Sequence, residues 1–366
     1  MKISLRAALT QFGRMLQQGL FPRLKRELGP LGETHQQMIK VLTMACLEPH
    51  LDGKGGGRGR PSHDRVKLAR AFVAKAVFNF ATTEALIRSL HSDAVLRRIC
   101  GWDEERQVPD KTIFSRAFSE FAKAELPQRV HEALIRQTQT ERLIGHISRD
   151  ATAIAARERV AKPQPTAAKP QPKAKRKRGE PKPPEKLTRI ERQQTMTLPQ
   201  MLADLPQACA VGCKTNSHGR KETWRGYKLH LDVADGQIPI SAILTGASVH
   251  DSQAAMPLSE MTAQRVNNLY DLMDSAYDCE ALRKRSQQLG HVPIIERLQR
   301  CHGLLPMAPH EAARYRERTS VERVNSRLKD EFGGRNVRVR GSSKVMAHMM
   351  FGLVALTVDQ LLRLAP

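Results

Sequence analysis

Aromatic residues are scarce in this chain: Phe, Trp and Tyr make up only 4% of its 366 residues. Proteins that bind single-stranded nucleic acid stack successive bases on aromatic side chains, so this scarcity argues against a binder of that kind. Long apolar runs are lacking as well. The longest one near the C-terminus, Met349–Val358, has about half of the ~20 residues that a membrane-spanning helix needs. It predicts a buried helix in a protein without membrane segments.

Acidic residues are few relative to basic ones, 37 Asp and Glu against 60 Lys and Arg, which leaves a formal net charge of +23. Such a surplus repels itself and calls for an anionic partner. Nucleic acid is the leading one, because each neutralised phosphate releases counterions and adds affinity. A structural protein of the ribosomal type would carry a similar charge. Because aromatic residues are scarce, the backbone of double-stranded DNA fits better than a single strand.

Cysteines are few and scattered, six in all, which predicts free thiols in a reducing compartment. Cys209, Cys213 and His218, with His230 nearby, could bind zinc. Their spacing is not that of a zinc finger and no second pair follows, so free thiols are the simpler interpretation. No secretory signal is visible in residues 1–26. Their lack of acids resembles a mitochondrial transit peptide, and a basic helix near DNA is the alternative that the rest of the chain favours.

Residues 1–140 carry helical patterns throughout. Ser62, Thr83 and Asp110 are each expected to cap a helix, because apolar residues at helical spacing follow them. The Gly/Arg-rich stretch at 53–61 predicts a flexible joint. Short helices with Lys and Arg between them are compatible with a helix-turn-helix-like unit, although an ordinary helical bundle has the same pattern. We expect this region to be a helical N-terminal DNA-binding domain.

Residues 155–205 differ from the rest in composition. Between Ala161 and Ile190 there are seven prolines, and ten Lys and Arg stand against two Glu, a surplus of eight positive charges. Such a segment cannot bury enough apolar surface to fold, so we predict a basic, Pro-rich, disordered insert. Its run Lys173–Arg178 resembles a nuclear-localisation or nucleic-acid patch, and a solvated linker that touches DNA nonspecifically is the simpler interpretation.

The remaining residues, 141–154 and 206–366, alternate between strand and helix patterns. Asp235-Gly236 predicts a hairpin turn between strands at Tyr227–Val233 and Ile238–Leu244. Further strands are predicted at 143–148, 269–273 and 292–295, and helices at 252–261, 279–288, 311–332 and 344–364. A hairpin followed by alternating strands and helices predicts an α/β domain with a mixed sheet.

Three acidic residues stand where a site can form. Asp150 is expected to close the first strand and Asp274 a later one, and ligands gather at strand ends in open α/β sheets. Glu322 lies in the helix predicted at 311–332. Asp278, four residues after Asp274, is an alternative, but it is expected to cap the next helix. The sequence therefore predicts that Asp150, Asp274 and Glu322 meet.

One face of the helix predicted at 311–332 carries an unusual set of side chains. At ~100° per residue, Tyr315, Arg318, Glu322 and Lys329 fall on one narrow stripe. The opposite stripe is apolar and is formed by Val321, Val324 and Leu328. A hydroxyl, two cations and a carboxylate suit a site that binds a metal and phosphates, whereas an ordinary solvated helix face would have the same pattern.

The spacing Tyr315-x2-Arg318-x3-Glu322-x6-Lys329 resembles the signature of a large branch of bacterial insertion-sequence DDE transposases. Other segments that resemble this branch are Asp150-x-Thr152, Asp274-Ser-Ala-Tyr-Asp278 and His250-Asp-Ser252, together with 57–61 and 109–116 of its helical N-terminal domain. The resemblance covers most of the chain apart from the basic insert.

This resemblance implies an α/β, RNase H-like mixed-sheet catalytic domain at 141–154 and 206–366, preceded by an all-helical domain. Asp150, Asp274 and Glu322 would be the catalytic residues and would bind two Mg²⁺ ions, or Mn²⁺ in their place. The enzyme would cleave the ends of an insertion sequence and join their 3′-hydroxyls to target DNA by two-metal phosphoryl transfer.

The resemblance also implies partners. Tyr315, Arg318 and Lys329 would bind the backbone of double-stranded DNA, both transposon ends and target. A homodimer is expected in the synaptic complex, no membrane is involved, and the location is the bacterial cytoplasm.

Two other functions remain open. A site-specific nuclease on the same fold would cleave without joining, and an inactive derivative would only bind DNA. The complete set of acids argues against the inactive derivative. His250 could act as a general base, but a two-metal site needs none, and a helix-start or core histidine is as plausible.

Overall fold

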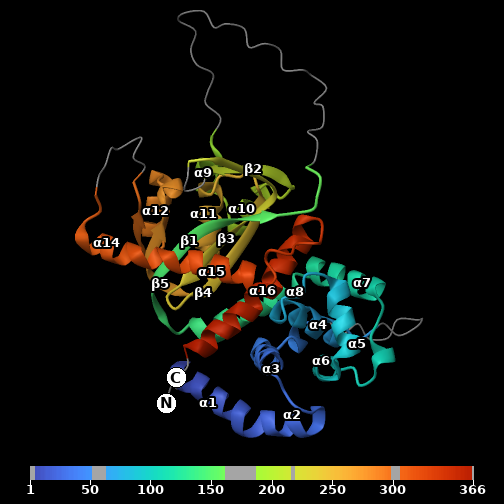
Figure 1. Ribbon diagram of the computed structural model, residues 1–366. Coiled ribbons are helices and arrows are strands. Elements are labelled where there is room, and N and C mark those ends of the chain that lie inside the picture. The colour runs from blue at the N-terminus through green and yellow to red at the C-terminus, as the bar shows by residue number, and fades with distance from the viewer. Residues whose placement is uncertain (1–4, 52–62, 161–186, 216–218, 298–305, 365–366) are drawn as a thin grey trace, which may run out of the picture.

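The computed structural model describes residues 5–51, 63–160, 187–215, 219–297 and 306–364. Ser62, the Gly/Arg-rich stretch at 53–61, Lys173–Arg178 and His218 lie outside the described residues. A group of helices precedes a mixed sheet, and a long C-terminal helix returns to that group (Figure 1). This arrangement confirms the predicted class, an RNase H-like mixed-sheet domain after a helical N-terminal region.

The described residues before 140 form helices and no strands. Their bounds are α1 (Leu5–Met15), η1 (Leu16–Leu20), α2 (Phe21–Leu28), α3 (Glu33–Ala45), η2 (Glu48–His50), α4 (Arg65–Val77), α5 (Thr83–Ser92), α6 (Ala94–Cys100), η3 (Glu105–Gln107), α7 (Lys111–Lys123) and α8 (Leu126–Gln139). Their apolar faces meet in one core that includes Phe72, Phe114 and Leu134.

Side-chain caps decide where four of these helices begin: α4, α5, α6 and α7. The Asp110 carboxylate accepts the Thr112 N–H at 2.7 Å, as predicted for α7. Two predicted caps are wrong by one or two positions. Asp64, not Ser62, accepts N–H groups at the start of α4, and Thr82, not Thr83, caps α5. In both cases a neighbouring side chain, that of Asp64 or Thr82, accepts the free N–H groups of the first helical turn.

The sheet has six strands in the described residues. They are β1 (Leu143–Ala155), β2 (Ala210–Thr215), β3 (Lys221–Ala234), β4 (Ile238–Gly246), β5 (Asn267–Met273) and β6 (Val292–Ile295). The first half of β3 pairs with β2 and the second half with β4, while β1 lies along its other edge. The hairpin strands are antiparallel as predicted, and β5 and β6 continue the sheet in parallel with β1.

Strand β1 is longer than predicted. Asp150 was expected to close it, but the strand continues to Ala155, because residues 151–155 remain paired with β3. That prediction is therefore wrong, and Asp150 lies within the strand. The prediction for Asp274 is confirmed, since β5 ends at Met273.

Helices cover both faces of the sheet. The other helical segments are α9 (Arg189–Gln193), α10 (Leu198–Asp204), α11 (Ser252–Ala263), η4 (Ser275–Tyr277), α12 (Glu280–Gln288), α14 (Pro309–Tyr315), η5 (Arg316–Arg318), α15 (Thr319–Asp330) and α16 (Ser342–Arg363). Alternate β1 side chains define the two faces. Asp150 and Thr152 contact α15, whereas Arg149 binds Asp232, which also accepts a hydrogen bond from Thr262 of α11.

Two predictions about helices need correction. Part of the segment predicted to be disordered is folded, because α9 and α10 pack against α11. Arg189 and Arg192 of α9 both form ion pairs with Asp204 of α10. The single helix predicted at 311–332 is interrupted by the 3₁₀ turn η5, so Tyr315 ends one helix and Glu322 lies in the first turns of the next.

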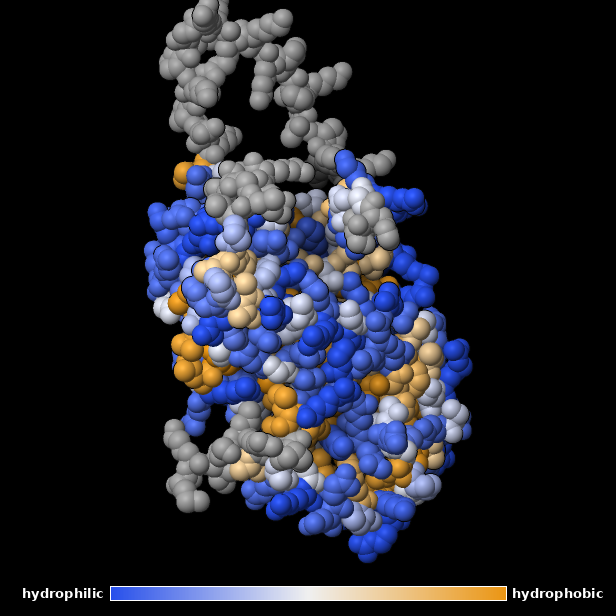
Figure 2. Space-filling model, turned by 60° about the vertical axis from the view of Figure 1, so that its left-hand side comes forward, coloured by the Kyte–Doolittle hydropathy of each residue, from blue (hydrophilic) through white to orange (hydrophobic). Residues whose placement is uncertain are grey.

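The C-terminal helix α16 joins the two parts of the fold. It packs on α3, α4, α7 and α8 and also on β4, and Figure 1 shows it running between the sheet and the N-terminal helices. The helix is long and apolar enough to cross a membrane, but 78% of its most apolar window is buried inside the protein. It is therefore the buried helix that the sequence predicts. The surface seen in Figure 2 is mostly hydrophilic, with hydrophobic residues in separate small patches.

Candidate active site

Asp150 in β1 and Asp274, directly after β5, lie at the same level of two neighbouring strands. Ser148 of β1 pairs in parallel with Leu272 of β5, so both aspartates lie two residues further along in the same direction. Asp274 leaves the sheet at this point, and its carboxylate accepts the Ala276 N–H at 3.0 Å. The sheet register thus brings together two of the three predicted carboxylates.

Asp150 is partly buried beneath α15. Its Oδ2 accepts a hydrogen bond from Asn325 Nδ2 at 3.2 Å. Burial, together with the negative charge of Asp274, raises the pKa of Asp150 to about 7. Burial also raises the pKa of Asp274, and nearby Asp251 adds to that rise. Two carboxylates in such surroundings attract cations.

Arg318 supplies one positive charge to this region. It lowers the pKa values of both Asp150 and Asp274, although burial and the other acids outweigh it. Its guanidinium lies 5.8 Å from the centre of the Tyr315 ring and donates a hydrogen bond to Glu322 Oε1 at 2.6 Å. Arg318 thus links the aspartate pair to the third predicted acid.

Glu322 is turned toward solvent. Its side chain is 52% exposed, and in the described residues its hydrogen-bond partner is Arg318, four residues before it. Asn325, one turn further along α15, faces the sheet instead and contacts Asp150. The structure therefore brings Asp150 and Asp274 together but leaves Glu322 beside Arg318.

Tyr315 and Lys329 mark the two ends of the predicted stripe. The Tyr315 hydroxyl donates to Glu296 Oε2 at 3.3 Å, just beyond β6. Lys329 Nζ donates to Thr152 Oγ1 at 2.5 Å, on the same face of β1 as Asp150. Both side chains are half-buried, so the stripe lies along the edge where α15 meets the sheet.

Sequence reasoning missed several neighbours of the aspartates. Asp251 raises the pKa of both, and Lys228 Nζ donates to its Oδ1 at 2.8 Å. Tyr277 is fully buried, and its hydroxyl has no hydrogen-bond partner among the described residues. The His250-Asp-Ser252 and Asp274-Ser-Ala-Tyr-Asp278 motifs could have pointed to Asp251 and Tyr277, whereas nothing in the pattern singled out Asn325.

The other candidates have structural roles. Asp278 was expected to cap α12, but it accepts a hydrogen bond from Arg283 at 2.8 Å, so that prediction is wrong. His250 is hydrogen-bonded to Ser252 at 2.8 Å. In the described part of the chain no three His, Cys, Asp or Glu residues lie close enough to hold a metal together, which includes Cys209 and Cys213.

The donor set fits a hard divalent cation in part. Asp150 and Asp274 offer carboxylate oxygens, and Asn325 Oδ1 is buried without a hydrogen-bond partner among the described residues. Oxygen ligands of this kind suit Mg²⁺, and a cation would relieve the repulsion between the two carboxylates. Glu322 joins this set only if its side chain leaves Arg318.

Asp150 should make protein stability depend on pH. The folded pKa near 7 lies above the ~3.9 of an unfolded aspartate, so folding favours the protonated form, and this contribution is lost as pH rises from about 4 to 7. We expect Asp150→Asn to raise the free energy of unfolding by about 2–4 kcal/mol near pH 8 in metal-free buffer, and to change it little near pH 4. Denaturant titrations at both pH values measure this, and an equal gain at both would contradict it.

Comparison with known families agrees with this geometry. Residues 206–358 match the family described as Transposase DDE domain, and residues 26–120 match the family described as Transposase domain (DUF772). The first match includes Asp274 and Glu322 but begins after Asp150. No curated protein and no solved structure matches the chain. Two transposase domains thus occur in order along one chain, the second over strands β2 to β6 of the sheet. The chain belongs to the insertion-sequence DDE transposases.

Proposed function

We propose that this chain cleaves DNA at the ends of an insertion sequence and joins the 3′-hydroxyl ends to target DNA. The observation that carries the proposal is that Asp150 lies in β1 and Asp274 directly follows the neighbouring parallel strand β5, at the same level, with Arg318 beside both. Enzymes of this family typically use divalent metal ions. We assign the chain to the branch whose signature is Tyr315, Arg318, Glu322 and Lys329.

Asp150, Asp274 and Glu322 are the residues that would hold two Mg²⁺ ions, or Mn²⁺ in their place. When bound, such ions activate the attacking oxygen and stabilise the leaving one. Asn325 fixes the orientation of the Asp150 carboxylate by its hydrogen bond. Arg318 limits the repulsion between the aspartates and keeps Glu322 beside the site.

Tyr315, Arg318 and Lys329 would hold the DNA backbone at the edge where α15 meets the sheet, because cations and a hydroxyl suit phosphate oxygens. Residues 1–140, whose core is completed by α16, would bind double-stranded DNA, and the basic segment between β1 and α9 would touch DNA without sequence preference. A homodimer would bring the two transposon ends together, in the bacterial cytoplasm.

A strand-joining assay tests the proposal. Sequencing the DNA that flanks the gene identifies terminal inverted repeats, and labelled, precleaved ends with these repeats are incubated with a plasmid target and Mg²⁺. We expect labelled ends to become joined to the plasmid, and chelation of the metal to abolish the product. A reaction unaffected by the chelator would overturn the metal assignment.

The same assay separates the alternatives. A nuclease would cut uncleaved ends without joining precleaved ones, and an inactive derivative would bind DNA and do neither. Either result would reject transposition as the function of this chain.

A further inference from the structure

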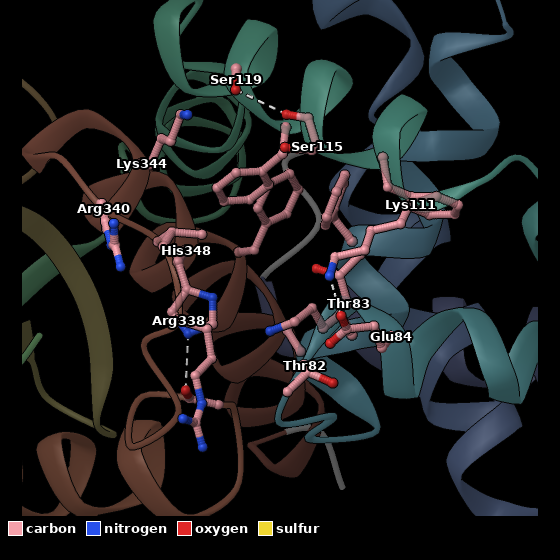
Figure 3. A pocket seen from close by; sticks show the side chains of 18 of the residues that line it. Thr82, Thr83, Glu84, Lys111, Ser115, Ser119, Arg338, Arg340, Lys344 and His348 are labelled. Atoms are coloured by element: carbon pink, nitrogen blue, oxygen red, sulfur yellow. Dashed lines mark hydrogen bonds and ion pairs between the residues drawn. The ribbon is translucent and has the colours of Figure 1, made fainter. Parts of the chain in front are cut away.

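A second polar site lies away from the aspartates. A cavity of about 690 Å³ separates the N-terminal helices from the segment that follows α15. In Figure 3, Thr82, Glu84 and Lys111 line one side, and Arg338, Arg340 and His348 line the other. This volume lies within the range of cavities that bind small organic ligands.

Positive charge dominates the lining of this cavity. Its cations are Lys75, Lys111, Arg157, Arg338, Arg340 and Lys344. The acid in the lining is Glu84, which is ion-paired with Lys111. Among the residues that the structure describes, none of the other five cations has a carboxylate partner. Burial removes water from the Lys75 ammonium and lowers its pKa to about 8, so a bound anion would stabilise its charged form. The cavity therefore favours an anion.

The floor of the cavity is apolar. Five of the ten phenylalanines of the chain line it: Phe72, Phe114, Phe118, Phe332 and Phe351. A simple inorganic anion would gain nothing from such a floor. A ligand that joins a phosphate to a flat, weakly polar ring would use both the cations and the phenyl groups.

We propose that this cavity holds one unpaired nucleotide of the bound DNA, with its phosphate at Arg338, Arg340 and Lys344 and its base against the phenylalanine floor. The inference rests on the proposed function in taking DNA as the partner. A nucleotide that remains paired could not enter, because its base is stacked inside the duplex.

The path along the protein from the acidic residues to the cavity is short enough for one DNA strand to reach both. Helix α15 leads from Glu322 toward Phe332 at the cavity, ten residues on, which is about 15 Å at ~1.5 Å per residue. From Asp150 to Arg157, seven residues of mostly extended chain span about 23 Å at ~3.3 Å each. At ~3.4 Å per nucleotide, these path lengths correspond to about four nucleotides from Glu322 and about seven from Asp150. Lys329 stands between the acidic residues and the cavity.

Binding of fluorescent duplexes tests the inference. One duplex carries a single extra, unpaired 2-aminopurine, and the other is fully paired. We expect the unchanged protein to bind the bulged duplex about tenfold more tightly, because the bulged base needs no unpairing. Two variants should reduce this preference to about twofold or less: Arg338→Gln/Arg340→Gln removes two cations, and Ser115→Trp fills the cavity while keeping every charge.

A matched control removes the same charge elsewhere. Arg98→Gln/Lys123→Gln neutralises two exposed cations outside the cavity and should weaken both duplexes without changing the preference. Equal binding of the two duplexes by the unchanged protein would overturn the inference, and so would a preference that survives in Arg338→Gln/Arg340→Gln. Displacement of the bulged duplex by free dAMP, without any bulge preference, would assign the cavity to a free nucleotide instead.

The two proposals fail separately. A protein that joins transposon ends but shows no bulge preference contradicts this inference alone. A protein whose bulge preference depends on the cavity, but which neither cleaves nor joins DNA, contradicts the proposed function alone.

Discussion

Replacement of Asp150 or Asp274 by asparagine is expected to reduce joining of transposon ends by on the order of 10³-fold or more, with DNA binding nearly unchanged. Each substitution keeps the shape and hydrogen-bonding reach of the side chain but removes a negative charge from the aspartate pair. Gel-based joining assays measure the loss, and binding of the same labelled ends is measured in parallel. Joining within about tenfold of the unchanged protein would place the reaction elsewhere.

Glu322 has a matched control on its own helix. Arg318–Glu322 and Arg327–Glu331 are both ion pairs between residues four apart on the α15 region, and both glutamates are about half exposed. We expect Glu322→Gln to lose joining to a similar degree as the aspartate variants, and Glu331→Gln to retain it. Equal activity of the two variants would limit the site to the aspartate pair.

Removal of Arg149 is expected to have the largest effect on stability. Its guanidinium binds both carboxylate oxygens of Asp232 at 2.7 Å, and the two side chains are 2% and 0% exposed. Arg149→Met would leave Asp232 charged and buried, with Thr262 as its remaining side-chain donor in the described residues. Breaking a buried pair in this way costs about 3–5 kcal/mol of the free energy of unfolding, measured by denaturant titration.

A double variant separates the loss of the pair from the loss of packing. Arg149→Met/Asp232→Leu removes both charges, so it should recover most of the stability that Arg149→Met loses. Because Arg149 is adjacent to Asp150 in β1, joining by the double variant also reports how far the pair positions that carboxylate. A double variant no more stable than the single one would assign the loss to packing.

Local patterns predicted much of the fold. The hairpin at Asp235-Gly236 and the strand that ends before Asp274 follow from side-chain alternation and turn residues, which act over a few positions. The position of Asp150 was misjudged, because the strand continues only where β3 pairs with residues 151–155, and such pairing is not a local property. The turn η5 was missed because the apolar pattern continues across it.

The site was predictable only in part, because it too depends on contacts between segments that are far apart in the sequence. The aspartate pair depends on strand order, which a resemblance can suggest. The sequence around Asn325 does not indicate its role, because its amide contacts Asp150 only when α15 packs on β1. The cavity lined by Lys75, Arg157 and Arg338 draws on segments that are far apart in the sequence, so no window of the chain contains its pattern.

The position of α16 has a consequence for synthesis. The N-terminal helices α3, α4, α7 and α8 pack on α16, which lies far later in the sequence, so their core stays incomplete until α16 has left the ribosome. Contacts between such distant segments slow folding and leave apolar faces exposed meanwhile. A gene copy that stops before the codons of α16 would thus yield the N-terminal helices without the helix on which they pack. Such a copy would yield no stable N-terminal fragment.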